Sequence, residues 1–412
     1  MDRKALSEQI VASSLFSAEL MGEVYKPPNL IRGVVDRRKQ NEEVASEIFN
    51  NAMEKLTVDY LGDTDKFKQA LDYISDNPTE SLINAITIKE TNPKARKVFR
   101  FDELKAIGQK MGFKQGDFIK ERDKALSVAK GQQGNIELYK HTTERFVGNK
   151  PWRVATKWER QRAMRGELKT YYRTSSKSYK VFTLDQTNLK PELHDSFFPD
   201  NKIDFNDEAQ VHAVRKGLMN YAMSLEDKIN ANIEKNNLNR SGKYSDRVSE
   251  PIAIRIMDDK KLKPGEPGRY EVKDNLRLIR LNANDSPRDL VRTEFKLLAK
   301  ASADYGAPQN SKINVGDKVR ADFEKKAATD EAMINYVLDK RYGLGDEPLS
   351  DREWTKRLKA YTQVEKDIRR HSNRIQNIVS GVSSEVDKSV NGLRMNERVI
   401  APQQNLERGI SM

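Results

Sequence analysis

Basic and aromatic residues alternate between Arg145 and Lys180, and this combination is suited to binding a nucleic acid. Eleven Lys and Arg residues stand against Glu159 and Glu167 in this stretch. Cations bind the phosphates of a strand, and flat aromatic side chains stack on bases with about 1–3 kcal/mol per base. The alternative is a solvated basic surface whose tryptophans belong to a hydrophobic core. The residues predicted to contact nucleic acid are Trp152, Arg153, Lys157, Trp158, Arg160, Arg162, Arg165, Lys169, Tyr171, Tyr172, Arg173 and Lys177.

The sequence offers few ligands for a transition metal. It contains no cysteine, which excludes disulfides and thiolate zinc sites, and its four histidines are His141, His194, His212 and His371. No two of them lie at the spacing of roughly three to five residues that a helical metal-binding pair requires. We therefore predict neither a metal nor a cofactor.

The segment DSPRDLVRTEFKLLAKASADYG, residues 285–306, is predicted to form a helix with a glutamate near its centre. Its residues 293–297 read T-E-F-K-L, where the helix of a zinc peptidase carries H-E-x-x-H. Without a water activated by a metal, Glu294 cannot hydrolyse a peptide at a useful rate, so we expect no catalysis from this helix. The alternative is an ordinary amphipathic helix that turns Val291, Phe295 and Leu298 to the core.

Composition and periodicity predict an α+β protein of several domains. Of the 412 residues 33% are charged, and the formal net charge of +12 favours an anionic partner. We expect a helical docking or scaffold domain over 1–135 and a small basic α/β segment over 136–200. Helices packed on a short β-sheet are expected over 205–380, followed by a polar, mobile tail over 381–412. No run of about 18 apolar residues and no signal peptide is evident, which predicts no membrane partner and a location in a cytoplasm.

The elements that must position Glu294 are a long amphipathic helix and three short strands. The helix is expected at about 207–235, and the strands at 251–256, 269–272 and 276–281. A later helix over 322–345 is closed by Gly343, and a last one begins at Ser350. In the basic segment, SYKVFTL (178–184) alternates as a strand does. Two shorter helices are expected at 101–113 and 116–130.

The order of several motifs is similar to that of ArdC-type antirestriction proteins and of phage polyvalent proteins. KVFTLDQTNL (180–189) resembles the closing strand of the N-terminal domain of that family, which implies a domain that binds single-stranded DNA. GRYEVKDNLRLIRLNANDSPRDLVRTEFKLLA (268–299) and EKKAATDEAMINYVLDKRYGL (324–344) follow the order of its zincin-like metallopeptidase domain. The resemblance covers about residues 150–345.

The departures from the family motif imply a pseudo-metallopeptidase. If Glu294 takes the place of the catalytic glutamate, Thr293 and Leu297 take the places of two metal-binding histidines. The third ligand falls on Ala332, with Glu331 one place away. Leucine and alanine donate no electron pair to zinc, and threonine is a poor neutral ligand. The four residues Thr293, Glu294, Leu297 and Ala332 are therefore vestigial, and the resemblance implies no catalytic residue and no metal.

Three functional hypotheses follow. The first is a non-catalytic protein of a phage or plasmid that binds single-stranded or double-stranded DNA in the host cytoplasm and gives antirestriction-like protection to incoming DNA. It extends to packaging in the virion interior and delivery with the DNA. The second is a structural or internal head protein that binds phage head or other virion proteins through residues 1–135. The third keeps an active zinc metallopeptidase with ligands rearranged among His212, Glu294 and Glu331.

Overall fold

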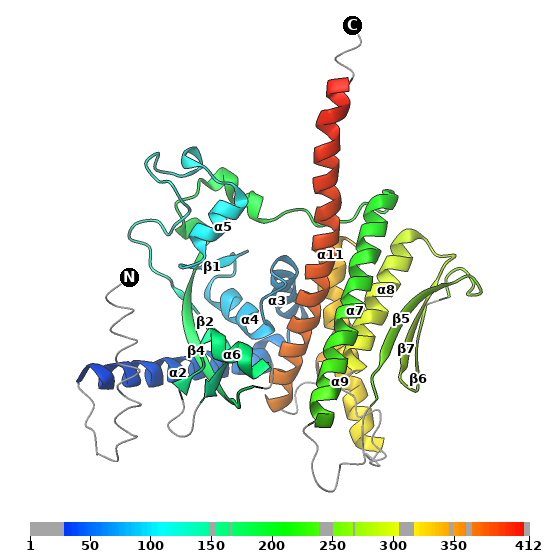
Figure 1. Cartoon of the computed structure of the whole chain (residues 1–412), viewed down its shortest axis with the longest axis horizontal. Helices are drawn as coiled ribbons and strands as arrows, with labels where there is room; N and C mark the ends of the chain where they lie inside the picture. Colours follow the sequence, from blue (N-terminus) through cyan, green and yellow to red (C-terminus); the bar gives the residue numbers. More distant parts are fainter. Residues whose placement is uncertain are drawn as a thin grey trace. The chain divides into compact units, whose positions relative to one another are not determined.

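The chain divides into two compact units, each of which combines helices with a small sheet. A computed structural model describes residues 29–147, 153–164, 167–238, 250–266, 268–304, 317–345, 349–359 and 365–407. The first unit comprises Met1–Glu54 and Thr87–Pro191, and the second comprises Lys55–Ile86 and Glu192–Met412. Figure 1 shows helices and strands in both, which confirms the α+β class.

The first unit is built on a four-stranded antiparallel sheet with the strand order β1-β4-β2-β3. Strands β2 and β4 form its main ladder, with eleven residue pairs from Ile136↔Val181 to Phe146↔Tyr171. The predicted strand 178–184 lies at the end of β4. The elements are α2 (Asn29–Lys55), β1 (Val98–Arg100), α5 (Leu104–Met111), β2 (Ile136–Val147), β3 (Arg153–Val154), α6 (Lys157–Met164) and β4 (Tyr171–Thr183).

Helix α2 packs against this ladder. The side-chain amide of Asn41 donates to the backbone oxygen of Ser178 at 3.3 Å and accepts from its backbone N–H at 3.1 Å. The amide therefore satisfies both backbone groups at the outer edge of β4, as a neighbouring strand would. Farther along α2, the ring of Phe49 packs against that of Tyr139 on β2, with 5.2 Å between the ring centres. These contacts fix α2 on the sheet.

The second unit has a three-stranded sheet in the order β5-β7-β6, covered on one face by helices. Strands β5 and β7 are parallel, and β6 runs antiparallel to β7. Helices α7 and α8 pack on the sheet, and α9 and α11 pack on those helices (Figure 1). The elements include α3 (Thr64–Asp76), α7 (Glu208–Leu238), β5 (Ala253–Asp259), β6 (Arg269–Lys273), β7 (Leu276–Asn282), α8 (Pro287–Asp304), α9 (Asp317–Tyr342), α10 (Asp351–Leu358) and α11 (Glu365–Glu407). The chain passes from the second unit back to the first between Ile86 and Thr87, within helix α4 (Leu82–Thr91).

Glycines allow α7 and α11 to approach each other closely. A Cβ added at Gly217 of α7 would lie 2.7 Å from the Cα of Val386 and 2.9 Å from the oxygen of Glu385. Reciprocally, a Cβ at Gly381 of α11 would lie 2.8 Å from the ring of Tyr221. Real Cβ atoms do not come this close to other atoms, so α7 meets the main chain of α11 at Gly217, and the ring of Tyr221 lies against the main chain of α11 at Gly381.

The structure differs from the predicted elements in three places. Helix α11 continues to Glu407, and Val382 and Val386 are buried, instead of the polar, mobile tail that the sequence predicts from 381. Residues 116–130 are not a helix but an irregular segment, which forms β-bridges from Phe118 to Leu189 and from Val128 to Thr187. The predicted helical domain over 1–135 is divided between the units, since β1 pairs with β4 while α3 belongs to the second unit.

Within the described ranges, no helix combines the length and the apolar character that crossing a membrane requires.

Substituting Gly217→Ala should lower the free energy of unfolding of the second unit by about 1–3 kcal/mol, because the added methyl group meets backbone that cannot move aside. Gly392→Ala is the matched control on α11, where nothing lies within 4 Å of an added Cβ. The control should be neutral or stabilising by up to about 1 kcal/mol, since alanine favours a helix over glycine. Urea titration of the three proteins measures both effects, and equal effects at the two positions would contradict the close packing.

Candidate functional site

Glu294 lies in the core of the second unit because it shares a helix face with apolar residues. Helix α8 starts with a capping pair, in which the Ser286 hydroxyl donates to the Asp289 carboxylate at 2.6 Å and accepts from the Asp289 N–H at 3.2 Å. Phe295 is buried beside Glu294, and the ring of Phe295 stacks on that of Tyr342 at 5.4 Å. Glu294 itself is 1% exposed. A carboxylate at such a position needs a compensating cation.

Arg215 of α7 is that cation. Its Nε donates to the Glu294 carboxylate at 3.1 Å, and its two Nη atoms bond the carboxylate of Asp258 on β5 at 2.6 and 3.2 Å. Burial raises the pKa of Glu294 to about 7, the charge and hydrogen bond of Arg215 lower it, and the charge of Asp258 raises it. The Glu294 carboxyl therefore titrates near neutral pH. A guanidinium shared by two carboxylates links α7, α8 and β5.

Thr293 and Leu297 face the chain ahead of β6. A Cβ added at Gly268 would lie 2.7 Å from the methyl group of Thr293, 3.1 Å from a methyl group of Leu297 and 2.6 Å from the backbone oxygen of Arg280. Backbone therefore fills the space over these two side chains. Ala332 is buried on α9, the helix that packs beside α8. Leucine and alanine offer no donor atom to a zinc ion, and threonine is a poor neutral ligand.

The rearranged metal site is not assembled. In the part of the chain that the structure describes, no three His, Asp or Glu side chains gather where they could hold a metal ion. His212 on α7, Glu294 on α8 and Glu331 on α9 therefore do not form a ligand cluster.

A second buried acid lies on α9, beside Arg292 of α8. Asp339 is 5% exposed, and Arg292 places its Nε 3.8 Å from the carboxylate. Burial raises the pKa of Asp339 to about 6, against the charges of Arg292, Lys296 and Arg288, which lower it. Arg288, Arg292 and Lys296 of α8 therefore act as cations near Asp339 of α9, separately from the ion pair between Arg215 and Glu294.

Helix α6 of the first unit presents an exposed tryptophan among cations. The helix starts after Thr156, which exchanges hydrogen bonds with Glu159 in a capping box at 2.9 and 3.3 Å. Trp158 is 60% exposed, so it is not a core residue. The guanidinium of Arg162 lies 4.7 Å from the centre of the Trp158 ring and 3.2 Å from the carboxylate of Glu167.

The β2–β4 ladder adds a second group of cations. Lys140 on β2 is exposed and lies directly opposite Lys177 on β4. Alternation along the strand puts Tyr171 on the same face as Lys177. The ammonium group of Lys169 lies 5.7 Å from the centre of the Tyr171 ring.

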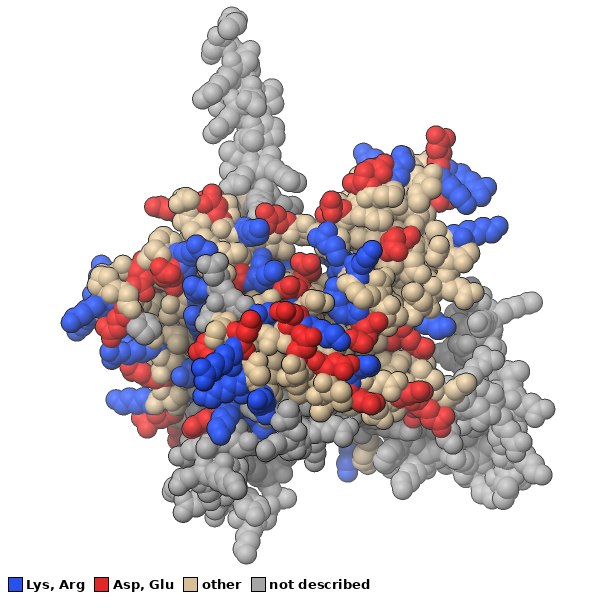
Figure 2. All heavy atoms as spheres, turned by 180° about the vertical axis from the view of Figure 1, so that it is seen from behind, with Lys and Arg blue, Asp and Glu red and all other residues tan. Residues whose placement is uncertain are grey.

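The structure places the predicted nucleic-acid contacts as follows. Those with described side chains are Lys157, Trp158, Arg160 and Arg162 on α6, Lys169 before β4, and Tyr171 and Lys177 on β4. Arg153, Tyr172 and Arg173 are on β3 and β4, where only the backbone is described, and Trp152 and Arg165 lie outside the described residues. We call Lys140 and the seven described residues the basic aromatic surface. Figure 2 shows basic and acidic side chains interspersed over one face.

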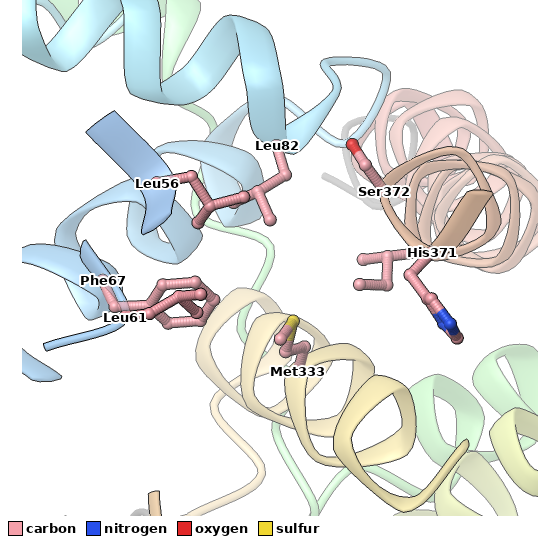
Figure 3. A pocket seen from close by; sticks show the side chains of 8 residues that line it. Leu56, Leu61, Phe67, Leu82, Met333, His371 and Ser372 are labelled. Atoms are coloured by element: carbon pink, nitrogen blue, oxygen red, sulfur yellow. The ribbon is translucent and has the colours of Figure 1, made fainter. Parts of the chain in front are cut away.

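Two hollows of the second unit do not extend the site. An internal cavity of about 10 Å³ has mainly apolar walls, with Phe67, Leu82 and Met333 around it (Figure 3), and has room for about one water molecule. The imidazole of His371 points away from it and bonds Asp330 at 2.7 Å. A surface cleft of about 330 Å³ has as many acidic as basic side chains, namely Asp72, Asp76 and Asp200 against Lys202, Lys340 and Arg341. This balance favours no particular ligand charge.

The sequence analysis missed Arg215, Asp258 and Lys140. Arg215 and Glu294 are 79 positions apart, so no local pattern relates them. Lys140 lies before the segment of high charge density that begins at Arg145, and its position opposite Lys177 depends on the pairing of β2 with β4.

Comparisons with known proteins add one structural likeness. No protein-family model matches the chain, and no curated protein matches it. The solved structures include a similar chain, the metal-free crystal structure of the antirestriction protein ArdC from the R388 plasmid. The match covers 74% of this chain and 85% of that chain, with 14% sequence identity and a TM-score of 0.34. A likeness of this extent leaves the function to be argued from the residues of this chain.

Glu294→Gln should make the stability of the second unit less dependent on pH. The folded-state pKa of about 7 exceeds the ordinary value of 4.5, so the native state holds a proton that the unfolded chain releases between these values. The free energy of unfolding of the wild type therefore falls as pH rises through this window, by about 3 kcal/mol at most. Glutamine has no proton to lose, and the variant should lack this part of the decline.

Denaturant titrations from pH 4.5 to pH 8 measure the difference, with Glu324→Gln as the control because Glu324 is exposed on α9. The control should follow the wild type. If Glu294→Gln also follows the wild type at every pH, Glu294 does not titrate in the core.

Proposed function

We propose that the protein binds single-stranded DNA through the basic aromatic surface and acts without catalysis. The observation that carries the proposal is the exposed indole of Trp158, set among the cations of α6 and within the same unit as the Lys140–Lys177 pair. Cations follow a phosphate backbone, and exposed rings stack on bases. Bases offer their faces only in unpaired strands, which is why a single strand is the favoured ligand.

The proposal extends to an antirestriction-like role, the protection of incoming phage or plasmid DNA. Its support is the sequence motif KVFTLDQTNL at the end of β4, which resembles the ArdC-type domain and lies in the same strand as Tyr171 and Lys177. A protein that covers single-stranded DNA as it enters a cell would limit the access of host enzymes to it.

We further propose that the second unit does not hydrolyse peptides. Glu294 is paired with Arg215, and Thr293 and Leu297 lie against the backbone at Gly268. A general base needs an activated water beside it, and the support for the proposal is that Leu297 and Ala332 cannot bind a metal that would activate one. The predicted virion partners, the virion interior and the host cytoplasm stay predictions.

The affinity for a short oligothymidine, measured against salt concentration, tests the proposal. The three exposed lysines Lys140, Lys157 and Lys169 would give a slope of log K against log [salt] of about −2.1, since each phosphate contact contributes about −0.7 on a single strand. Lys140→Gln and Lys169→Gln should each reduce the slope by about 0.7. Lys356→Gln, which removes an exposed lysine on α10 of the second unit, should leave it unchanged.

Absence of binding at about 50 mM salt, or a flat dependence on salt, would contradict nucleic-acid binding. A steep slope that responds equally to Lys140→Gln and Lys356→Gln would place the DNA elsewhere on the protein.

A further inference from the structure

Trp158 and Arg162 form a pair on one side of α6. They are one helical turn apart, and side chains at this spacing lie on the same face of a helix. The guanidinium of Arg162 is 4.7 Å from the centre of the indole ring, within the range of a cation–π contact. The indole is nevertheless 60% exposed, so Arg162 covers only part of it. The exposed part of the indole is a flat aromatic face on which a base can stack.

The guanidinium of Arg162 forms an ion pair with the carboxylate of Glu167. Its Nε lies 3.2 Å from the Glu167 carboxylate, and the side chains of both residues are partly exposed. A guanidinium held by a carboxylate at one edge and by an indole on its face is less suited to neutralise a phosphate than an exposed lysine is. Lys157, which precedes Trp158, is exposed. The two cations on either side of Trp158 therefore have different surroundings.

We propose that Trp158 is the platform on which one base of the bound strand stacks, and that Arg162 is a positioning residue that holds the indole ring instead of contacting phosphate. The inference rests on the proposed function and assigns different roles to residues that the sequence grouped together. One base stacks on the indole, because the guanidinium occupies part of the ring surface. Lys157 provides the phosphate contact beside it.

An abasic oligomer separates stacking from charge, because it carries the same phosphates as an oligothymidine of equal length but has no bases. The wild type should bind the oligothymidine more tightly than the abasic oligomer, by about 5- to 150-fold, from the energy of stacking one base. In Trp158→Ala this preference should be lost, while the affinity for the abasic oligomer and the salt slope stay the same. Trp158→Phe keeps an aromatic face and should retain most of the preference. Circular dichroism confirms that each variant is folded.

A comparison of Arg162→Gln with Lys157→Gln tests the positioning role, since each removes one positive charge from α6. Lys157→Gln should reduce the salt slope by about 0.7 and leave the preference for bases unchanged. Arg162→Gln should reduce the preference for bases severalfold and leave the salt slope unchanged. A reduced slope in Arg162→Gln with an intact preference would show that Arg162 contacts phosphate, which overturns its assignment.

The outcomes separate this inference from the proposed function. If the wild type binds neither oligomer, nucleic-acid binding itself fails. If it binds both with a steep salt slope and Trp158→Ala keeps the preference for bases, the basic surface binds DNA but Trp158 is not the platform.

Discussion

A charge that is removed from water, or placed beside a charge of the same sign, must be compensated, and this constraint governs both units of the protein. In the second unit it acts on Glu294, which the apolar face of α8 carries into the core. A buried carboxylate without a partner would cost several kcal/mol. The compensation comes from Arg215, whose guanidinium also binds Asp258, so that one cation joins α7, α8 and β5. The position that resembles a catalytic glutamate in sequence is thereby part of an ion-pair network.

In the first unit the same constraint acts at the surface. The register of β2 and β4 sets Lys140 opposite Lys177, and α6 adds Lys157 and Arg160 in the same unit. Cations gathered in one unit give its surface a positive potential that attracts anions. The exposed indole of Trp158 can stack on a base, which a simple anion does not have. A nucleic acid offers phosphates to the cations and bases to the indole.

The sequence predicted those elements whose determinants are local. Alternation predicted the end of β4, and the spacing of apolar residues together with an N-cap serine predicted α7 and α8. The irregular segment 116–130 was missed because its partners are distant, with Phe118 bridging to Leu189 and Val128 to Thr187. The length of α11 was missed because Val382 and Val386 lie in a polar stretch, and their burial depends on the close approach of α7 at Gly217. For the candidate site, residue types were predictable, but the pairing of Arg215 with Glu294 and the exposure of Trp158 arise from tertiary packing.

Ultraviolet crosslinking of an oligothymidine to the full chain, with mass spectrometric mapping of the modified peptides, tests the central claim most directly. Short-range crosslinks form only where a base touches a side chain, so the map reports the position of the bases independently of affinity. The account predicts that the adducts lie within residues 153–183 of the first unit and include Trp158. Adducts confined to peptides of the second unit would contradict it.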